Sequence, residues 1–302
     1  MNTIEVKDIN KSYEKGKVTA LKNVSFNVGK GELFGLIGPD GAGKTTIFRL
    51  LTTLLIPDSG EAKVLGYDIV KDYKQIRNLV GYMPGKFSLY ADLTIEENLN
   101  FFATLFGTTI EENYHLIKDI YEQIAPFKKR RAGKLSGGMK QKLALCCALI
   151  HKPEVLFLDE PTTGIDPVSR VELWDMLQKL KTEGITILAS TPYMDEAVRC
   201  DRVALIQEGE ILNIDTPDNI TGQFNKKLYA IKAGNMYALL KALKQYPETD
   251  NSYAFGEYAH VIVNGDVENL KSFLEKQGIS GIEVRNTLPT IEDTFIAESY
   301  KP

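Results

Sequence analysis

The hydrophobic positions in the first two hundred residues form short continuous runs that alternate with amphipathic stretches. Val155–Leu158 and Ile185–Ala189 are apolar almost throughout, as expected for strands that a parallel sheet buries on both faces. Between them, the helical periodicity of Val168–Lys181 predicts an amphipathic helix. Further strands are expected at Val24–Val28 and Glu32–Ile37, and a further helix at Thr45–Leu55. This alternation predicts an α/β fold.

The pattern changes at about residues 95–150, where helical periodicity continues with few strand signals. Thr94 and Glu97 have the spacing of a capping box, which predicts that a helix begins there. We therefore expect a helical insertion at about residues 86–150, within an α/β domain that occupies residues 1–218.

A second pattern follows Pro217. It predicts strand, helix, strand, strand, helix and strand, in that order, at Leu228–Lys232, Met236–Gln245, Ser252–Phe255, His260–Val263, Val267–Gln277 and Ile282–Arg285. This is the element order of the split βαβ, ferredoxin-like unit. We therefore place a small α+β domain at residues 219–302. Its sequence shows no cluster of titratable residues that indicates chemistry, which favours a docking or dimer-stabilising module.

The strongest candidate for chemistry is the GPDGAGKT segment at residues 38–45, which has the GxxxxGK[ST] pattern of a phosphate-binding loop. It follows an apolar run and precedes a predicted helix, as the motif requires. Its glycines let successive N–H groups point at phosphate oxygens, and the helix N-terminus adds a favourable field. Lys44 is expected to reach the β and γ phosphates, and the Thr45 hydroxyl to ligate Mg²⁺. The candidate ATP-binding residues are Gly38, Pro39, Asp40, Gly41, Ala42, Gly43, Lys44, Thr45 and Thr46.

Two carboxylates, Asp159 and Glu160, end the apolar run at Val155–Leu158. Ligands of parallel sheets bind at the carboxyl ends of the strands. We expect Asp159 to hold Mg²⁺ together with Thr45, and Glu160 to orient or polarise the attacking water. Such a strand end is structural about as often as functional, but a phosphate loop in the same chain makes it the expected partner.

A third element is the LSGGM segment at Leu135–Met139, which opens a helix expected over Lys140–Ile150. The Ser136 hydroxyl and the bare N–H groups of Gly137 and Gly138 form a second anion-binding device at a helix start. This segment resembles the LSGGQ signature of ABC ATPases, with Met139 in place of the usual Gln. The resemblance extends over residues 3–215 and implies a P-loop NTPase core of the ABC type.

The resemblance also implies a head-to-tail dimer. The loop at Lys44 binds ATP, and the Ser136 segment of the other subunit contacts the γ-phosphate of that ATP. Tyr13 occupies the position of the aromatic residue that stacks on adenine, and Asp166 lies in the D-loop that communicates between the two nucleotide sites. Residues 190–197 correspond to the switch region.

Three further positions depart from the pattern of the family. Gly85 stands where the family usually has a Gln that contacts Mg²⁺ and water, and Pro192 replaces the switch His that contacts the γ-phosphate. Asp40 replaces an Asn of the phosphate loop and is expected to face away from the phosphates. We hypothesise a slow, ATP-holding site that lends its Ser136 signature to a partner with the full set. A homodimer that relies on Glu160 alone is the competing interpretation.

Composition and charge narrow the function further. The longest continuous apolar run has eight residues, far below the roughly 20 that cross a bilayer, so a separate permease chain is expected to build the substrate path. A net charge of −4 provides no general attraction for nucleic acid. Three cysteines without CxxC spacing favour a reducing cytosol, and no signal peptide is evident. The expected location is therefore the cytoplasmic face of the inner membrane.

Three stretches resemble the ATPase subunits of drug or polysaccharide exporters: GYMPGKFSLYADLTIEENLNFF, TPYMDEA and TIEDTFIAESY. The expected function is thus an ATPase subunit of an ABC exporter that uses ATP and Mg²⁺. A soluble, non-transport ABC ATPase and a regulatory ATP-binding clamp with little turnover are the alternatives. A P-loop kinase or GTPase is the least expected, because neither uses an LSGGM segment.

Overall fold

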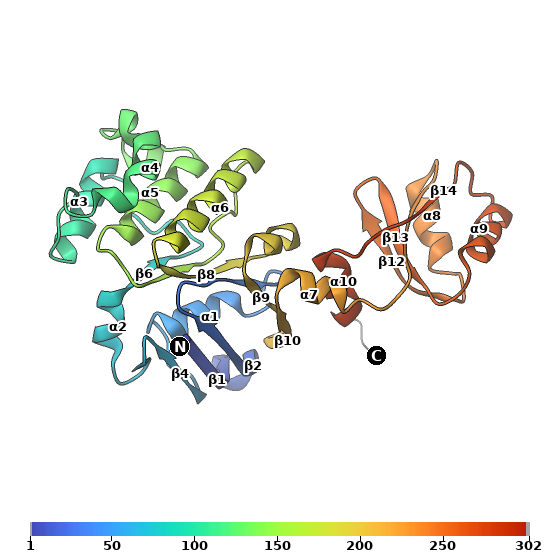
Figure 1. The fold of residues 1–302 in the computed structure, drawn as a ribbon, viewed down its shortest axis with the longest axis horizontal. Helices are drawn as coiled ribbons and strands as arrows, with labels where there is room; N and C mark the ends of the chain where they lie inside the picture. The colour runs from blue at the N-terminus through green and yellow to red at the C-terminus, as the bar shows by residue number, and fades with distance from the viewer. Residues whose placement is uncertain (1, 300–302) are drawn as a thin grey trace. The chain divides into compact units, whose positions relative to one another are not determined.

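The structure is a computed structural model that describes residues 2–299, with Lys15 described by its backbone only. The chain divides into two compact units, the first ending at Pro217 and the second beginning at Asp218 (Figure 1). None of the helices within residues 2–299 has the length and apolar composition that a membrane span requires.

A six-stranded sheet forms the centre of the first unit, in the order β10-β9-β3-β8-β7-β6. All neighbouring pairs are parallel except β9 and β10. The strands are β3 (Leu33–Ile37), β6 (Val80–Met83), β7 (Val155–Leu158), β8 (Thr186–Thr191), β9 (Arg202–Gln207) and β10 (Glu210–Asp215). Every residue of β3, β7 and β8 is buried, which explains their apolar runs. The predicted α/β fold is confirmed.

A second, antiparallel sheet in this unit has the order β2-β1-β4-β5. Its strands are β1 (Asn2–Tyr13), β2 (Val18–Gly29), β4 (Ser59–Val64) and β5 (Tyr67–Asp68). Of these four strands, the sequence predicts only part of β2, at Val24–Val28. Helix α1 (Lys44–Leu51) lies between the two sheets, and α6 (Pro167–Thr182) covers the opposite side of the parallel sheet (Figure 1). The phosphate loop is thus held between two sheets.

Helix α1 is shorter than the predicted Thr45–Leu55. The Thr52 hydroxyl donates to the carbonyl of Phe48 at 2.7 Å, and Thr53 takes a φ of 63°. A left-handed residue of this kind ends an α-helix. The chain therefore leaves the helix after Leu51.

The remaining helices of the first unit are α2 (Tyr73–Leu79), α3 (Ile95–Leu105), α4 (Tyr114–Ile124) and α5 (Gly137–Leu149), with 3₁₀ segments η1 (Glu14–Gly16), η2 (Ala125–Phe127), η3 (Ala132–Lys134) and η4 (Met194–Arg199). Helices α3, α4 and α5 pack together as the helical insertion. The capping box is present: Thr94 accepts the N–H of Glu97, and Glu97 accepts the N–H of Thr94. Helix α5 begins three residues before its predicted start.

The second unit contains α7 (Pro217–Gly222, which starts in the first unit), β11 (Leu228–Lys232), α8 (Met236–Leu243), β12 (Thr249–Phe255), β13 (Tyr258–Val263), α9 (Val267–Lys276), β14 (Glu283–Asn286) and α10 (Ile291–Ser299). Its antiparallel sheet has the order β12-β13-β11-β14, which is the ferredoxin-like arrangement. The C-terminal helix α10 had not been predicted.

A buried polar cluster attaches α10 to this sheet. His260 Nδ1 lies 2.6 Å from Asp293 Oδ1, which also accepts the Tyr253 hydroxyl. The Thr290 hydroxyl and N–H donate to Asp293 Oδ2. Burial alone would raise the pKa of Asp293, but these hydrogen bonds outweigh it and lower that pKa. The sequence does not mark this titratable cluster, and the visible role of the cluster is to hold α10 on the sheet.

Candidate nucleotide site

The phosphate loop at residues 38–43 joins the carboxyl end of β3 to α1 and depends on glycine at two positions. A Cβ at Gly38 would lie 2.1 Å from the carbonyl oxygen of Ile206. Gly43 has a φ of 107°, and a Cβ there would lie 2.6 Å from the carbonyl oxygen of Ala20. Larger residues would collide with backbone at both positions, so the glycines keep the loop close to its neighbours.

Lys44 is folded back onto this loop. Its Nζ donates to the carbonyls of Gly38 at 2.7 Å and Pro39 at 2.9 Å, and lies 3.2 Å from Glu160 Oε1. The Lys44 side chain is only 3% exposed. A buried ammonium needs such acceptors, because they replace the water it has lost. The structure therefore brings together Lys44 and Glu160, which the sequence placed in separate motifs.

Asp159 and Glu160 leave the carboxyl end of β7, and the last residues of β8 hold them. Ser190 Oγ donates to Asp159 Oδ1 at 2.8 Å and accepts the N–H of Glu160 at 3.0 Å. Glu160 has a φ of 53°, an uncommon value for a non-glycine residue that is sustained by its surroundings. Ser190 reaches both carboxylate residues because β8 lies between β3 and β7. The sequence had placed Ser190 only in the switch region.

The residues expected to bind Mg²⁺ fit a hard cation. Asp159 is 2% exposed, and its Oδ2 carries no hydrogen bond within residues 2–299. Thr45 lines the same cavity as Lys44 and Glu160. A carboxylate oxygen and a hydroxyl are ligands that Mg²⁺ accepts alongside water and phosphate oxygens.

A cavity of about 270 Å³ lies over this loop. Its lining consists of Tyr13, Val18, Thr19, Ala20, Gly41, Gly43, Lys44, Thr45, Thr46 and Glu160. The Tyr13 hydroxyl is 3.2 Å from Thr46 Oγ1, so this aromatic ring stands beside the phosphate loop. Asp40 is exposed and does not line the cavity.

The signature segment lines a second cavity of about 220 Å³. Its lining consists of Ser136, Gly137, Gly138, Met139, Lys142, Gly164, Ile165, Asp166 and Ser169. Ser136 caps α5 by accepting the N–H of Met139 at 3.3 Å. Asp166 caps α6 by accepting the N–H and the hydroxyl of Ser169, and these bonds lower its pKa. The two cavities share no lining residue, and the predicted site residues that line neither are Gly38, Pro39, Asp40, Ala42 and Asp159.

Two of the departures from the family pattern, Gly85 and Pro192, follow the strands β6 and β8, which pair with β7 on its two sides. A Cβ at Gly85 would be 3.0 Å from the carbonyl oxygen of Asp159, so the loop after β6 passes directly against the end of β7. Pro192 follows Thr191, the last residue of β8. Gly85 offers no side chain, and Pro192 offers no donor, to anything bound at Asp159.

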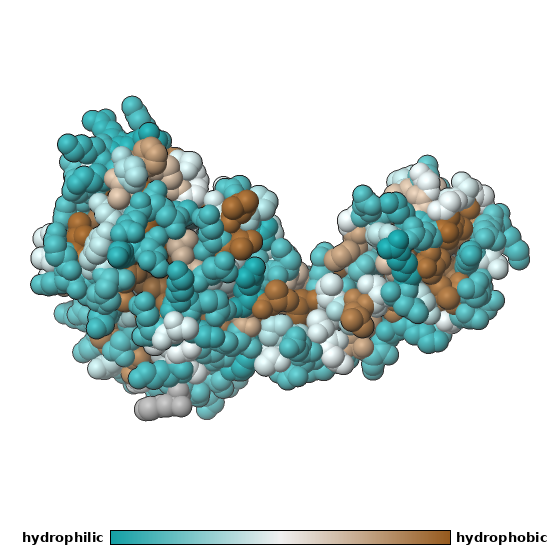
Figure 2. All heavy atoms as spheres, turned by 45° about the horizontal axis from the view of Figure 1, so that its top comes forward, coloured by the Kyte–Doolittle hydropathy of each residue, from teal (hydrophilic) through white to brown (hydrophobic). Residues whose placement is uncertain are grey.

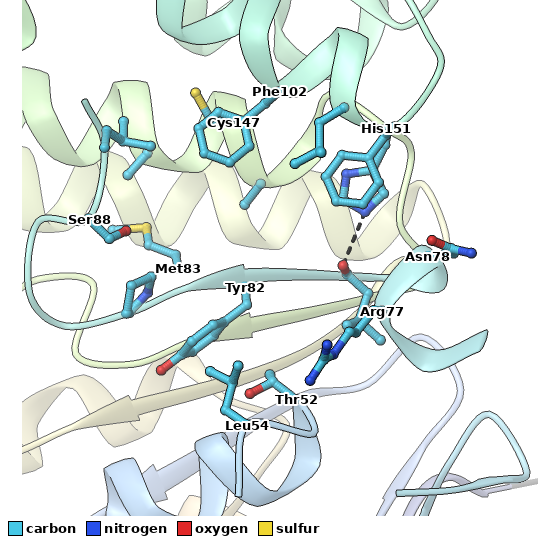
Figure 3. Close-up of a pocket in the computed structure, with 17 residues that line it drawn as sticks. Thr52, Leu54, Arg77, Asn78, Tyr82, Met83, Ser88, Phe102, Cys147 and His151 are labelled. Atoms are coloured by element: carbon cyan, nitrogen blue, oxygen red, sulfur yellow. Dashed lines mark hydrogen bonds between the residues drawn. The ribbon is translucent and has the colours of Figure 1, made fainter. Parts of the chain in front are cut away.

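A separate, mostly apolar groove of about 580 Å³ lies between the helical insertion and β6. Figure 3 shows its lining, with Phe102 from α3, Cys147 from α5, and Tyr82 and Met83 from β6. His151 Nε2 lies 3.1 Å from the carbonyl of Val80. Most of the surface visible in Figure 2 is hydrophilic. This groove is the largest of the cavities described here and does not contain the candidate nucleotide residues.

Comparisons with known proteins agree with this geometry. A family model described as "ABC transporter" matches residues 21–163. The chain is 42% identical over 92% of its length to a probable multidrug ABC transporter ATP-binding protein, YbhF of Escherichia coli K12, and covers 48% of that relative. It is 32% identical over 97% of its length to the Nod factor export ATP-binding protein I of Rhizobium sp. strain N33, and covers 95% of it.

Among solved structures, the dimeric MJ0796 bacterial ABC transporter cassette matches 70% of this chain and 98% of its own, with a TM-score of 0.64 and 26% identity. The chain spans about half the length of the YbhF relative but nearly the whole of the Nod factor relative. The chain therefore belongs to the ABC transporter family.

Proposed function

We propose that this chain is the ATP-binding and hydrolysing subunit of an ABC transporter that drives a separate permease for export. One observation carries the proposal: a single chain holds two separate cavities, one lined by Lys44 and one lined by Ser136, with no lining residue in common. A chain that bound one nucleotide by itself would have no use for the second cavity. Two chains arranged head to tail would use both.

In this proposal the phosphates of ATP enter the first cavity. Their oxygens replace the carbonyls of Gly38 and Pro39 as acceptors for Lys44 Nζ, and adenine stacks on Tyr13. Asp159 and Thr45 hold Mg²⁺, which when bound supplies positive charge to the β and γ phosphates. Lys44 must also leave Glu160, which frees the Glu160 carboxylate to orient the attacking water.

The second cavity then receives the γ-phosphate bound by the other subunit. The Ser136 hydroxyl and the N–H groups at the start of α5 provide its donors. Charge-assisted hydrogen bonds contribute about 1.5 to 3 kcal/mol each, so the loss of a γ-phosphate removes enough to open the interface. ATP binding would close the dimer, and hydrolysis would release it.

Turnover at the chain's own phosphate loop is proposed to be slow, because Gly85 and Pro192 remove two contacts to water, metal or phosphate. The Ser136 side of the chain keeps the serine and both glycines, with Met139 in place of Gln, so it can complete the site of a partner with the full set. A homodimer that hydrolyses ATP with Glu160 alone is the alternative.

The permease is proposed to bind at the apolar groove. Leu54 and Leu105 line it and are exposed, which is unfavourable unless a partner covers them. The export assignment rests on the names of the relatives, which describe multidrug transport and Nod factor export. We accordingly propose a location at the cytoplasmic face of the membrane and no nucleic-acid partner.

Light scattering with Mg²⁺ and ATP tests the proposal. We expect the Glu160→Gln chain to double in mass with ATP, or to associate with a second ATP-binding subunit. In a separate ATPase assay, its steady-state turnover should be about 10²- to 10⁴-fold below that of the unmodified chain. The proposal fails if the mass stays that of one chain with the permease and every candidate partner supplied. Rapid turnover by the isolated chain, abolished in Glu160→Gln, would favour the homodimer. Tight ATP binding with no product over hours, even with a partner, would favour a regulatory clamp.

A further inference from the structure

The end of β8 contacts two different carboxylates on its two faces. Successive side chains of a strand point to opposite faces of its sheet. Ser190 accordingly reaches Asp159 and Glu160 of the nucleotide site. The next residue, Thr191, instead donates to Glu196 Oε2. A movement of this strand end would therefore change hydrogen bonds on both faces of the sheet.

Glu196 is a buried carboxylate, 4% exposed, whose two oxygens are both occupied. Oε2 accepts the hydroxyls of Thr191 and Thr162, and Oε1 accepts Arg170 Nε at 2.8 Å. Thr162 belongs to the segment that runs from Glu160 to Asp166. The carboxylate thus joins the strand end, this segment and α6. Removing one of these partners would leave a buried charge without compensation, which costs stability.

Arg170 completes this connection from α6. Its Nη2 lies 3.3 Å from both carboxylate oxygens of Asp195, and its guanidinium stacks over the ring of Tyr193 at 4.0 Å. It therefore holds the residues that follow Pro192. Four residues before Arg170, Asp166 caps the same helix and lines the signature cavity. A continuous set of contacts leads from Asp159, through β8, Glu196 and Arg170, to Asp166.

We propose that Glu196 and Arg170 are positioning residues that transmit the occupancy of the phosphate loop to the signature cavity of the same chain. This inference rests on the proposed function, in which the two cavities serve different nucleotides. Ligand binding around Asp159 shifts Ser190 and, with it, Thr191. The hydrogen bonds that join Glu196 to Thr191 and to Arg170 carry that shift to the start of α6. The connection is especially important in this chain, because Pro192 cannot report on the phosphate by a hydrogen bond.

Hydrogen exchange on the full chain, read by mass spectrometry, tests the proposal. The probe is Mg²⁺ with a non-hydrolysable ATP analogue, at a protein concentration where scattering shows single chains. We expect the analogue to slow exchange about tenfold at residues 161–169 as well as at the phosphate loop. In Arg170→Ala and Glu196→Gln, protection of the phosphate loop should remain within about twofold, while the slowing at residues 161–169 should be lost. Arg170→Lys keeps the positive charge but cannot bond Glu196 and Asp195 together as the planar guanidinium does, so it should lose most of the slowing at residues 161–169.

Arg199→Ala is the matched control. Arg199 lies in η4 and pairs with Asp175 of α6 at 3.1 Å, so it joins the same two elements, but this pair is 39% and 60% exposed and contacts neither Thr162 nor Thr191. This variant should keep the response. The proposal is overturned if the unmodified chain shows no slowing at residues 161–169, if Arg170→Lys and Glu196→Gln retain it, or if Arg199→Ala loses it equally. Failure of the proposed function would show separately, as absence of ATP-dependent association in scattering.

Discussion

The two cavities of the N-terminal unit differ in how much of the family pattern they retain. The phosphate-loop cavity is lined by Lys44 and Glu160, and Asp159 directly precedes Glu160, but the side-chain donors of the family pattern are absent at Gly85 and Pro192. The signature cavity keeps its serine, both glycines and the D-loop aspartate. In the proposed function, groups that bind ATP are thus present on both sides, whereas groups that assist turnover are missing on one. This difference makes the proposal that holding ATP and splitting it depend on separable residues testable.

Lys44→Ala tests ATP binding at the phosphate-loop cavity and should have the largest effect of the variants proposed. At least two charge-assisted hydrogen bonds to phosphate would be lost, at about 1.5 to 3 kcal/mol each, so ATP affinity should fall about 10²- to 10⁴-fold in a calorimetric titration. Lys22→Ala removes an exposed lysine paired with Glu210 and should change nothing. Affinity within twofold of the unmodified chain in Lys44→Ala would show that the loop does not grip phosphate.

Ser136→Asp tests the other cavity without disturbing the helix. Aspartate caps a helix as well as serine does, so folding should be unaffected. A carboxylate at this position would repel a γ-phosphate by several kcal/mol, and ATP-dependent association in light scattering should weaken about 100-fold. Affinity of the chain's own loop for ATP should stay within about twofold, and Ser136→Thr should behave as the unmodified chain. Normal association of Ser136→Asp would exclude this cavity from the interface.

The sequence predicted those parts of the site whose chemistry is local. The phosphate loop, the strand ending in Asp159, and the capping box at Thr94 each depend on residues within about eight positions of one another, and all lie where expected. The strand order was not predictable in this way. Ser190 holds Asp159 only because β8 lies between β3 and β7, and the sequence carries no signal of that order.

The missed elements have physical reasons as well. Strand β1 is rich in charged and polar residues and shifts register several times against β2, so neither alternation nor a continuous apolar run marks it. The left-handed backbone of Glu160 is imposed by contacts from β8 rather than by residue type. The cluster around Asp293 joins residues 33 and 40 positions apart, and it forms only when α10 lies on the sheet.

Pro192→His should partly restore ATP hydrolysis at the phosphate-loop cavity. A histidine there could donate to the γ-phosphate, and single donors to developing charge contribute about 10²- to 10³-fold in other enzymes, so at least about a tenfold rise in steady-state ATPase activity is expected. Gly85→Gln should give less by itself, because its Cβ must fit 3.0 Å from the carbonyl of Asp159. Pro192→Ala adds no donor and should leave the rate unchanged. An equal rise in Pro192→Ala would assign the effect to backbone freedom.

The smallest expected effect separates two roles of Asp166. Its carboxylate accepts the N–H of Ser169 as the cap of α6, and its charge faces the signature cavity. Loss of the cap in Asp166→Ala should cost about 1 kcal/mol in the free energy of unfolding, measured by urea denaturation. Asp166→Asn keeps an equivalent cap and should keep that stability. If Asp166→Asn nevertheless weakens ATP-dependent association, the charge itself acts at the interface; if association changes only in Asp166→Ala, then the residue serves the signature cavity solely by holding the start of α6.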